Sequence, residues 1–168
     1  MNILMMSNTY TPFLGGVERS IQIFSRQFRA LGHRVVIVAP TFENMPEEEE
    51  DVVRVPAIQK FNGTDFSVQL PIPGVLNANL QHFVPDIVHS HHPYLIGGTA
   101  LRVAARYRVP VVFTFHTFYE RYTHYVPGDS PQLKTFVIEL SKGYANLCDR
   151  VIAPSRTVER ELQKRGVD

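Results

Sequence analysis

The stretch that decides the fold is NILMMSNTYTPFLGGVERSIQIFSRQFRALGHRVVIVAP, residues 2–40. It opens with a short apolar run at 2–7, which is typical of a buried parallel strand. Apolar residues then recur at helical spacing, at Val17, Ile21, Phe24, Phe28 and Leu31. Gly32 is expected to end that helix with a positive φ, and Pro40 to end a second apolar run at 34–40. The stretch predicts a complete strand-helix-strand unit.

The same alternation continues to the end of the chain. Further apolar runs, dense in β-branched residues, lie at 51–56, 85–90, 109–116 and 149–154. Helical patterns are expected near 75–83 and 95–107, whereas 57–74 is interpreted as either irregular structure or a hairpin. Strands interleaved with helices predict an α/β fold, a Rossmann-like parallel sheet with helices on both faces, because right-handed crossovers place them there.

Two serines mark the start of the last helices. Ser130 followed by Pro131 predicts a cap and first turn, and Ser155 predicts a cap for a helix that Gly166 ends. The longer helix is expected to turn one apolar face to the core, formed by Leu133, Phe136, Val137, Leu140, Tyr144 and Leu147.

Composition narrows the class of protein. A chain of 168 residues is long enough for one core, so a single domain over 1–168 is expected. The formal net charge of +1 gives no reason to expect a nucleic-acid partner. Cys148 is the only cysteine, and neither a signal peptide nor an apolar run long enough to span a membrane is present, which favours a cytoplasmic location. The acidic run 47–51 is interpreted as a solvated loop.

Ligands of such sheets bind beyond the carboxyl ends of the strands, where the strand order reverses. The loops expected at that edge are unusual: TPFLGG at 11–16, SHHPYLIGG at 90–98 and FHTFYERYTHY at 115–125. We therefore expect the ligand site at this edge.

Gly15 and Gly16 precede the first helix. A glycine pair there lets backbone N–H groups approach an anion, and the helix dipole favours negative charge, so a diphosphate would suit it. The alternative is a helix entry that needs a positive φ. The pair is not a G-x-G-x-x-G fingerprint, so a dinucleotide is not indicated. Gly97 and Gly98 are interpreted as a packing accommodation.

The loop histidines allow two interpretations. His91 and His116 could approach one metal ion, but no carboxylate or thiolate at a known spacing completes a ligand set, so no metal is expected. His89 is expected to be a core residue. His116, at the end of the fifth strand, is the histidine expected to hydrogen-bond a sugar hydroxyl or a reacting oxygen.

Five segments carry a family resemblance: TYTPFLGGVERSI, LGHRVVIVAP, PDIVHSHHPYLIGG, PVVFTFHTFYERYTHY and CDRVIAPS. In this order and spacing they resemble the amino-terminal domain of group 1 glycosyltransferases, the retaining two-Rossmann-domain type. The resemblance spans essentially the whole chain. The segment FHTFYERYTHY is most similar to members that glycosylate diacylglycerol or its glycosides.

The resemblance implies residue roles. Gly15 and Gly16 are expected to lie against the donor diphosphate, and His116 to contact the transferred sugar as the catalytic residue. The amino-terminal domain of this family mainly receives the acceptor, which makes acceptor-binding candidates of Tyr119, Arg121, Tyr122, His124 and Tyr125. For each of them a solvated loop residue is the alternative. The carboxy-terminal domain, which holds most nucleotide-sugar contacts in the family, does not follow Asp168, so the chain alone is expected to be inactive.

The expected function is transfer of a sugar from a nucleotide-sugar donor to an acceptor, a diacylglycerol-type lipid being one candidate, with no cofactor or metal. Other expected partners are the missing carboxy-terminal domain and an anionic membrane surface, because the chain is net basic from Arg102 onward and Arg19, Arg26 and Arg29 lie off the apolar stripe of the first helix. Peripheral contact with the inner membrane face would follow. Three alternatives stay open: a non-catalytic nucleotide- or sugar-binding module, a glycosyltransferase with a sugar-phosphate or polysaccharide acceptor, and a metal-dependent hydrolase.

Overall fold

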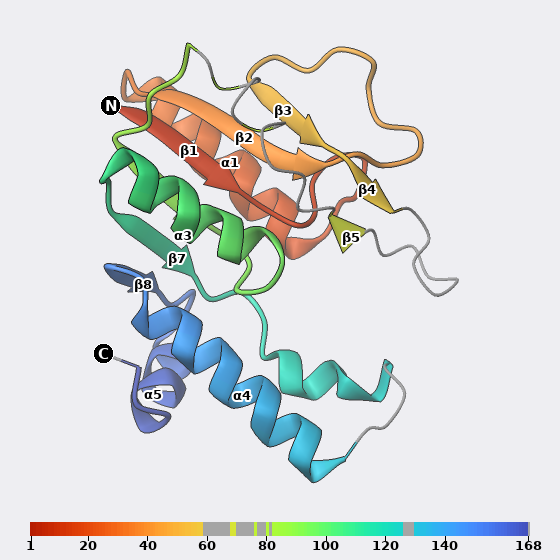
Figure 1. Ribbon diagram of the computed structural model, residues 1–168, viewed down its shortest axis with the longest axis vertical. Coiled ribbons are helices and arrows are strands. Elements are labelled where there is room, and N and C mark those ends of the chain that lie inside the picture. The colour runs from red at the N-terminus through yellow and green to blue at the C-terminus, as the bar shows by residue number, and fades with distance from the viewer. Residues whose placement is uncertain (59–67, 70–75, 77–79, 81, 126–129, 168) are drawn as a thin grey trace.

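The computed structural model describes residues 1–58, 68–69, 76, 80, 82–125 and 130–167. Its centre is a parallel sheet of six strands in the order β3-β2-β1-β6-β7-β8 (Figure 1). The strands are β1 (Asn2–Met6), β2 (Arg34–Pro40), β3 (Val52–Val55), β6 (Ile87–Ser90), β7 (Val111–Thr114) and β8 (Arg150–Ile152). Each coincides with a predicted run, so the α/β, Rossmann-like fold is confirmed.

The helices also begin and end close to their sequence signals. They are α1 (Gly16–Ala30), α3 (Ile96–Tyr107), α4 (Pro131–Asn146) and α5 (Arg156–Lys164), with a 3-10 helix η2 at Tyr119–Tyr125. The Ser130 and Ser155 hydroxyls accept hydrogen bonds from the N–H groups of Leu133 and Val158, as caps do. Gly32 and Gly166 follow α1 and α5 with φ of 81° and 79°, the conformation expected of glycine after a helix.

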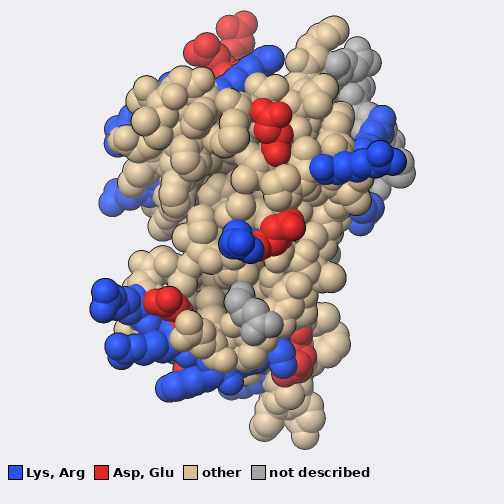
Figure 2. Space-filling model, turned by 90° about the vertical axis from the view of Figure 1, so that its left-hand side faces the viewer, with Lys and Arg blue, Asp and Glu red and all other residues tan. Residues whose placement is uncertain are grey.

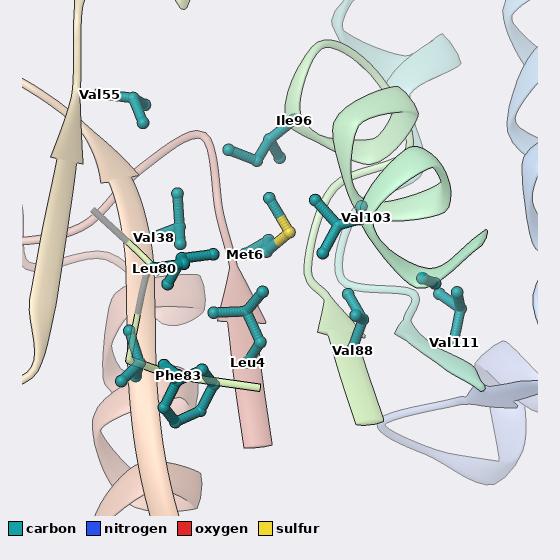
Figure 3. Close-up of a cluster of buried hydrophobic side chains, with 13 residues drawn as sticks. Leu4, Met6, Val38, Val55, Leu80, Phe83, Val88, Ile96, Val103 and Val111 are labelled. Atoms are coloured by element: carbon teal, nitrogen blue, oxygen red, sulfur yellow. The ribbon is translucent and has the colours of Figure 1, made fainter. Parts of the chain in front are cut away.

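The central strands bury both faces. Leu4 and Met6 of β1 pack with Ile96 and Val103 of α3 in one cluster, whose buried side chains fill the space between sheet and helix in Figure 3. Ile3 and Met5 pack in a second cluster beneath α1. Because successive strand residues point to opposite faces, a continuous apolar strand requires a helix on each side. Figure 1 shows α1 and α3 on opposite faces of the sheet.

A third cluster joins the last strands to the last helices. Phe113 and Phe115 of the β7 segment pack with Tyr144 of α4 and Leu162 of α5. The Phe113 and Tyr144 rings meet edge to face at 5.0 Å. This cluster fixes α4 and α5 against β7 and β8, at one side of the sheet.

The prediction of which α4 residues face the core is wrong in part. Tyr144 is 7% exposed, but Phe136, Leu140 and Leu147 are 59%, 45% and 68% exposed. Helix α4 is rotated so that Ser141 and Ala145 are buried instead. The Tyr94 hydroxyl donates to the Val137 carbonyl at 2.9 Å and bonds the Ser141 hydroxyl, which gives this side of the helix polar partners. Leu31, placed at the end of the first apolar stripe, is likewise exposed at 70%.

The acidic run is only partly solvated. Glu49 pairs with Arg54 at 2.6 Å, and Arg54 also donates to the carbonyls of Pro40 and Thr11. The interpretation of this run as a solvated loop is therefore wrong at Glu49, because the Arg54 guanidinium binds its carboxylate and covers most of the side chain.

The region after β3 is described in part. β4 (Ala57–Ile58) pairs with β5 (Val68–Gln69) in an antiparallel sheet of two strands, as a hairpin would. The helix expected near 75–83 lies mainly outside the described residues. Within the described residues, no helix is both long and apolar enough to cross a membrane.

Candidate functional site

The strand order reverses between β1 and β6. From β1 the chain passes to β2 on one side, whereas β6 leads to β7 on the other. The loops that follow β1, β6 and β7 therefore leave the sheet at one edge, next to each other. As expected from the sequence, these are the loops that carry the glycine pair, the histidines and the aromatic segment.

Gly15 and Gly16 form the start of α1. Gly15 is the N-cap residue with φ of −91°, and Gly16 is not among the glycines with positive φ, so the alternative of a left-handed helix entry is wrong. A β-carbon added to Gly16 would meet nothing within 4 Å. No side chain caps the helix, which leaves its first N–H groups without the usual side-chain acceptor. This end of α1 is open to a ligand.

Glu18 lies beside these glycines. It is only 5% exposed, and a β-carbon on Gly15 would stand 2.5 Å from its Oε2 atom. Its charge also acts on His116, whose pKa it raises against the stronger opposite effect of burial. An anion from the chain itself thus borders both predicted contact points, the glycine pair and the histidine.

His91 and His116 are joined by a hydrogen bond between Nδ1 of His91 and Nε2 of His116, at 2.9 Å. His91 follows β6 and His116 follows β7, neighbouring parallel strands that pair Ser90 with Phe113. The two histidines that could have shared a metal ion therefore use one ring nitrogen each on the other. Within the described part of the chain, no group of three or more His, Cys, Asp or Glu side chains is placed to hold a metal.

His89, in β6, and His92, in the loop after it, have structural roles. His89 is 4% exposed, as expected of a core residue, and its Nε2 atom bonds the Thr114 hydroxyl at 2.7 Å. His92 accepts a hydrogen bond from the Asn8 N–H at Nδ1, at 3.1 Å, and Asn8 in turn accepts from the N–H of Ile96 at the start of α3. These bonds tie the loop after β1 to the loop after β6.

Burial keeps the whole cluster neutral at pH 7. The pKa of His116 is lowered to about 4, because the effect of burial exceeds the opposite effect of the Glu18 charge. Burial lowers the pKa of His89 to about 4 and that of His92 to about 3, with the charge of His116 adding to the effect. For His91 burial lowers the pKa well below its ordinary value. The physical cause is the loss of water around a charged ring.

The aromatic segment forms η2, and its candidate acceptor residues differ in their exposure and in their contacts. Tyr119 is half-buried with its ring 5.0 Å from that of Tyr94. Arg121 is exposed, with its guanidinium 4.9 Å from the centre of the Phe118 ring. Tyr122 is 53% exposed and stacks with the exposed His124 at 6.5 Å. Tyr125 ends the helix, and its side chain lies outside the described part of the structure.

Helix α5 holds η2 in place. Arg165 binds Glu120 at 2.9 Å and Glu161 at 3.1 Å, and its guanidinium lies 4.7 Å from the centre of the Phe118 ring. Next to it is a hollow of about 290 Å³, lined by Phe118, Arg121, Thr157, Arg160, Glu161 and Lys164. Arg121 thus faces α5 at this hollow, which neither Gly15, Gly16 nor His116 lines.

The family model described as glycosyltransferase family 4 matches residues 14–168. The chain belongs to glycosyltransferase family 4. The resemblance to group 1 glycosyltransferases is thereby confirmed.

Relatives of this family 4 chain have sequence identities to it of a little more than a quarter. A GDP-mannose-dependent alpha-mannosyltransferase of Corynebacterium glutamicum is 28% identical over 100% of the chain, and an alpha-monoglucosyldiacylglycerol synthase of Streptococcus pneumoniae is 28% identical over 94%. The chain spans 41% and 36% of the lengths of these two proteins. A solved structure of sucrose-phosphate synthase from Thermosynechococcus elongatus matches 99% of the chain with a TM-score of 0.66 at 16% identity, which supports the fold alone.

Sequence reasoning missed two features of this family 4 site. Glu18 was not considered, although a glutamate three positions after an N-cap is a recognisable pattern. The direct bond between His91 and His116 was not foreseen either, since a shared metal ion was the only link considered between them, and His116 was otherwise expected to contact the sugar. The signal for this hydrogen bond in the sequence was weak. Each histidine follows a predicted strand of the same sheet, but the pairing of those two strands is a tertiary property.

Proposed function

We infer that the full-length protein carrying this chain transfers a sugar from a nucleotide-sugar donor to an acceptor. The observation that supports this most is the placement of the open start of α1 and of His116 at one edge of the sheet, bridged by the charge of Glu18. Family membership supports the reaction class. The names of the mannosyltransferase and glucosyldiacylglycerol synthase relatives support a nucleotide-sugar donor and a lipid among the candidate acceptors.

In this proposal the chemistry at Gly15 and Gly16 is electrostatic. Loss of a nucleoside diphosphate from a sugar builds negative charge on the leaving phosphate and positive charge at the anomeric carbon. Unpaired N–H groups at the start of α1 are oriented toward such an anion before it forms, and preorganised donors of this kind commonly supply a large part of catalysis. The glycines contribute by leaving the approach open. A cation is not needed for this step.

His116 holds the transferred sugar. Its pKa of about 4 makes it neutral at pH 7, so it binds through a hydrogen bond and carries no charge to the anomeric centre. In the retaining chemistry that the resemblance implies, the acceptor hydroxyl enters on the face that the diphosphate leaves. The departing phosphate oxygen then takes the acceptor proton.

The acceptor is proposed to bind at η2. Arg121, Tyr122 and His124 are exposed on η2, and the exposed Phe136 and Leu140 of α4 provide apolar surface on the helix that packs against η2. A lipid with apolar chains and a polar hydroxyl would match such a surface. The donor contacts that this chain lacks would come from a carboxy-terminal domain, which the 41% and 36% spans of the two relatives support.

Peripheral contact with the inner face of the cytoplasmic membrane is part of the same proposal. Figure 2 shows Lys and Arg side chains gathered over the lower part of one face, where Figure 1 places α4 and α5. Exposed cations such as Arg156, Arg160 and Lys164 on α5 would attract anionic lipid. Of the three arginines of the first helix expected to contact lipid, Arg29 instead binds groups of the chain itself. It donates to the Val35 carbonyl at 2.9 Å and pairs with Asp51.

The test uses the full-length protein with GDP-mannose and UDP-glucose, each offered with diacylglycerol, glucosyldiacylglycerol or a soluble sugar acceptor. Transfer is expected with one donor, and His116→Ala should lower turnover strongly while circular dichroism and thermal unfolding show an intact fold. The 168-residue chain alone is expected to transfer nothing. Unchanged turnover in His116→Ala would remove His116 from the mechanism. Donor binding without any transfer would favour the non-catalytic module.

Vesicle sedimentation tests the membrane contact separately. Binding should increase with the anionic lipid fraction and decrease with salt. Transfer to a sugar phosphate or polysaccharide without vesicle binding would favour the non-lipid acceptor.

A further inference from the structure

The His91 side chain is almost completely buried, and only one of its two ring nitrogens has a hydrogen-bond partner among the described residues. It is 1% exposed, and its Nε2 atom has no hydrogen-bond partner among the described residues. Its Nδ1 atom is the one that bonds Nε2 of His116. One ring nitrogen of His91 is thus satisfied by a second histidine, and the other faces an environment without a polar partner.

A hydrogen bond between two neutral imidazoles has two forms. In the first, His91 carries its proton on Nδ1 and donates to Nε2 of His116, whose own proton is then on Nδ1. In the second, His116 carries its proton on Nε2 and donates to Nδ1 of His91, whose proton is then on Nε2. Both rings are neutral at pH 7, because burial lowers both pKa values.

The two forms differ in what they leave unpaired at Nε2 of His91. The first leaves a lone pair, and the second leaves an N–H group. Unpaired buried N–H donors are rarer in proteins than incompletely satisfied acceptors, and an unmade donor bond costs about 1–3 kcal/mol. The first form is therefore favoured, and in it Nδ1 of His116 carries a proton.

The remaining nitrogen of His116 is available to a ligand. His116 is half-buried, and its Nδ1 atom makes no hydrogen bond to any residue in the described ranges. We propose that His91 is a positioning residue that sets the tautomer of His116, so that Nδ1–H of His116 is offered as a hydrogen-bond donor to an oxygen of the transferred sugar. This rests on the proposed function for the identity of the ligand, but the tautomer itself does not.

One consequence is mechanistic. With Nδ1 protonated and Nε2 engaged by His91, His116 has no lone pair to offer the acceptor hydroxyl. His116 could remove the hydroxyl proton as a general base only if His91 and His116 both changed to their other tautomers. Proton removal is thereby assigned to the departing phosphate oxygen, and His116 contributes by orienting the sugar.

The tautomer is measured by nitrogen-15 NMR on histidine-labelled full-length protein at pH 7, without substrate. The His116 signals are assigned by their loss in His116→Gln. We expect a protonated nitrogen at Nδ1 of His116 and an unprotonated one at Nε2. The reverse pattern in the unsubstituted protein overturns the proposal.

Two variants of nearly equal shape separate the donor role from packing. His91→Asn places an amide N–H near the original Nδ1 atom, so His116 should keep its Nδ1–H form. His91→Asp places only acceptors there, so His116 should change to the Nε2–H form and its pKa should rise. Thr114→Val, which removes the partner of His89 and not that of His91, is the control and should leave His116 unchanged. An Asp variant that keeps the Nδ1–H form, or an Asn variant that loses it, contradicts the proposal.

Activity gives the second measurement. Turnover should fall about 10- to 100-fold in His91→Asp, as for other residues that orient a functional histidine, and much less in His91→Asn. Equal losses in the two variants indicate packing alone and overturn the positioning role. Should His91→Asp fail to fold, the unsubstituted protein and His91→Asn still decide the tautomer. An Nδ1–H tautomer in a full-length protein that transfers no sugar would refute the proposed function and leave the tautomer assignment standing.

Discussion

The Glu18 carboxylate lies over Gly15, so closely that a β-carbon on this glycine would stand 2.5 Å from Oε2. The start of α1 therefore has a carboxylate of its own beside the N–H groups proposed to receive the donor diphosphate. Its charge also raises the pKa of His116 against the effect of burial. A diphosphate bound there, as proposed, would have to overcome or displace this charge.

Glu18→Gln tests that relationship. A unit charge about 6 Å from one singly charged phosphate group, at an effective dielectric constant of about 20, is repelled by about 3 kcal/mol before solvent screening, and removing that charge removes this repulsion. We expect the donor KM to fall about 3- to 10-fold, and the pKa of His116 to fall further below its ordinary value. Steady-state kinetics and histidine NMR measure the two effects. Glu139→Gln, on the exposed side of α4, is the control. A rise in donor KM would mean that Glu18 holds the donor.

Gly16→Ala tests the open approach to α1. The new β-carbon would meet nothing within 4 Å, so the free energy of unfolding should stay the same or rise by up to about 1 kcal/mol. The donor KM should rise about tenfold, because the methyl group occupies the space that the diphosphate needs. Gly143→Ala is the matched control, since this glycine also has open space around it but lies in α4. Equal kinetics in both variants would place the diphosphate elsewhere.

Arg165→Ala tests how η2 is held. Glu120, with only 12% of its side chain exposed, would lose its 2.9 Å partner, and Phe118 would lose the guanidinium above its ring. We expect a loss of about 1–2 kcal/mol in the free energy of unfolding and faster hydrogen exchange across η2. The acceptor KM should rise while the donor KM changes little. Arg165→Lys should recover part of the loss, and Gln163→Ala, on the exposed side of α5, should have little effect.

The buried histidines predict a dependence of stability on pH. Their folded pKa values are depressed, to about 4 for His89 and about 3 for His92, from 6.5 when exposed. As pH falls below 6.5 the unfolded chain binds protons that the folded chain does not, so the free energy of unfolding decreases until the folded values are reached. At pH 5 each residue should cost about 1–2 kcal/mol relative to pH 7.

Urea unfolding at pH 7 and pH 5 measures this loss. His89→Leu removes one titrating group, so its stability should depend less steeply on pH even if its stability at pH 7 is lower. His82→Gln replaces an exposed histidine and should retain the original dependence. Equal stability of the unsubstituted protein at the two pH values would contradict the neutral, buried cluster.

The strands and caps were predictable because each depends on neighbouring residues. The apolar run at 34–40 forms β2, and Ser130 caps α4 through a bond to a residue three positions on. The face of α4 was not predictable in the same way. Its periodicity allowed Phe136 and Leu140 to face the core, but the bond from Tyr94 to the carbonyl of Val137 holds the helix in another rotation.

The sequence by itself determined the sheet, the edge at which the ligand loops meet, and the family, because hydrophobic period and turn residues act over a few positions and parallel strands share one carboxyl edge. Only the tertiary structure decided which loop side chains touch. His91 and His116 are 25 residues apart and meet at 2.9 Å through the register of β6 and β7. The charge of Glu18 reaches His116 because α1 covers that face of the sheet. Contacts of this kind depend on how whole elements pack, which no local pattern encodes.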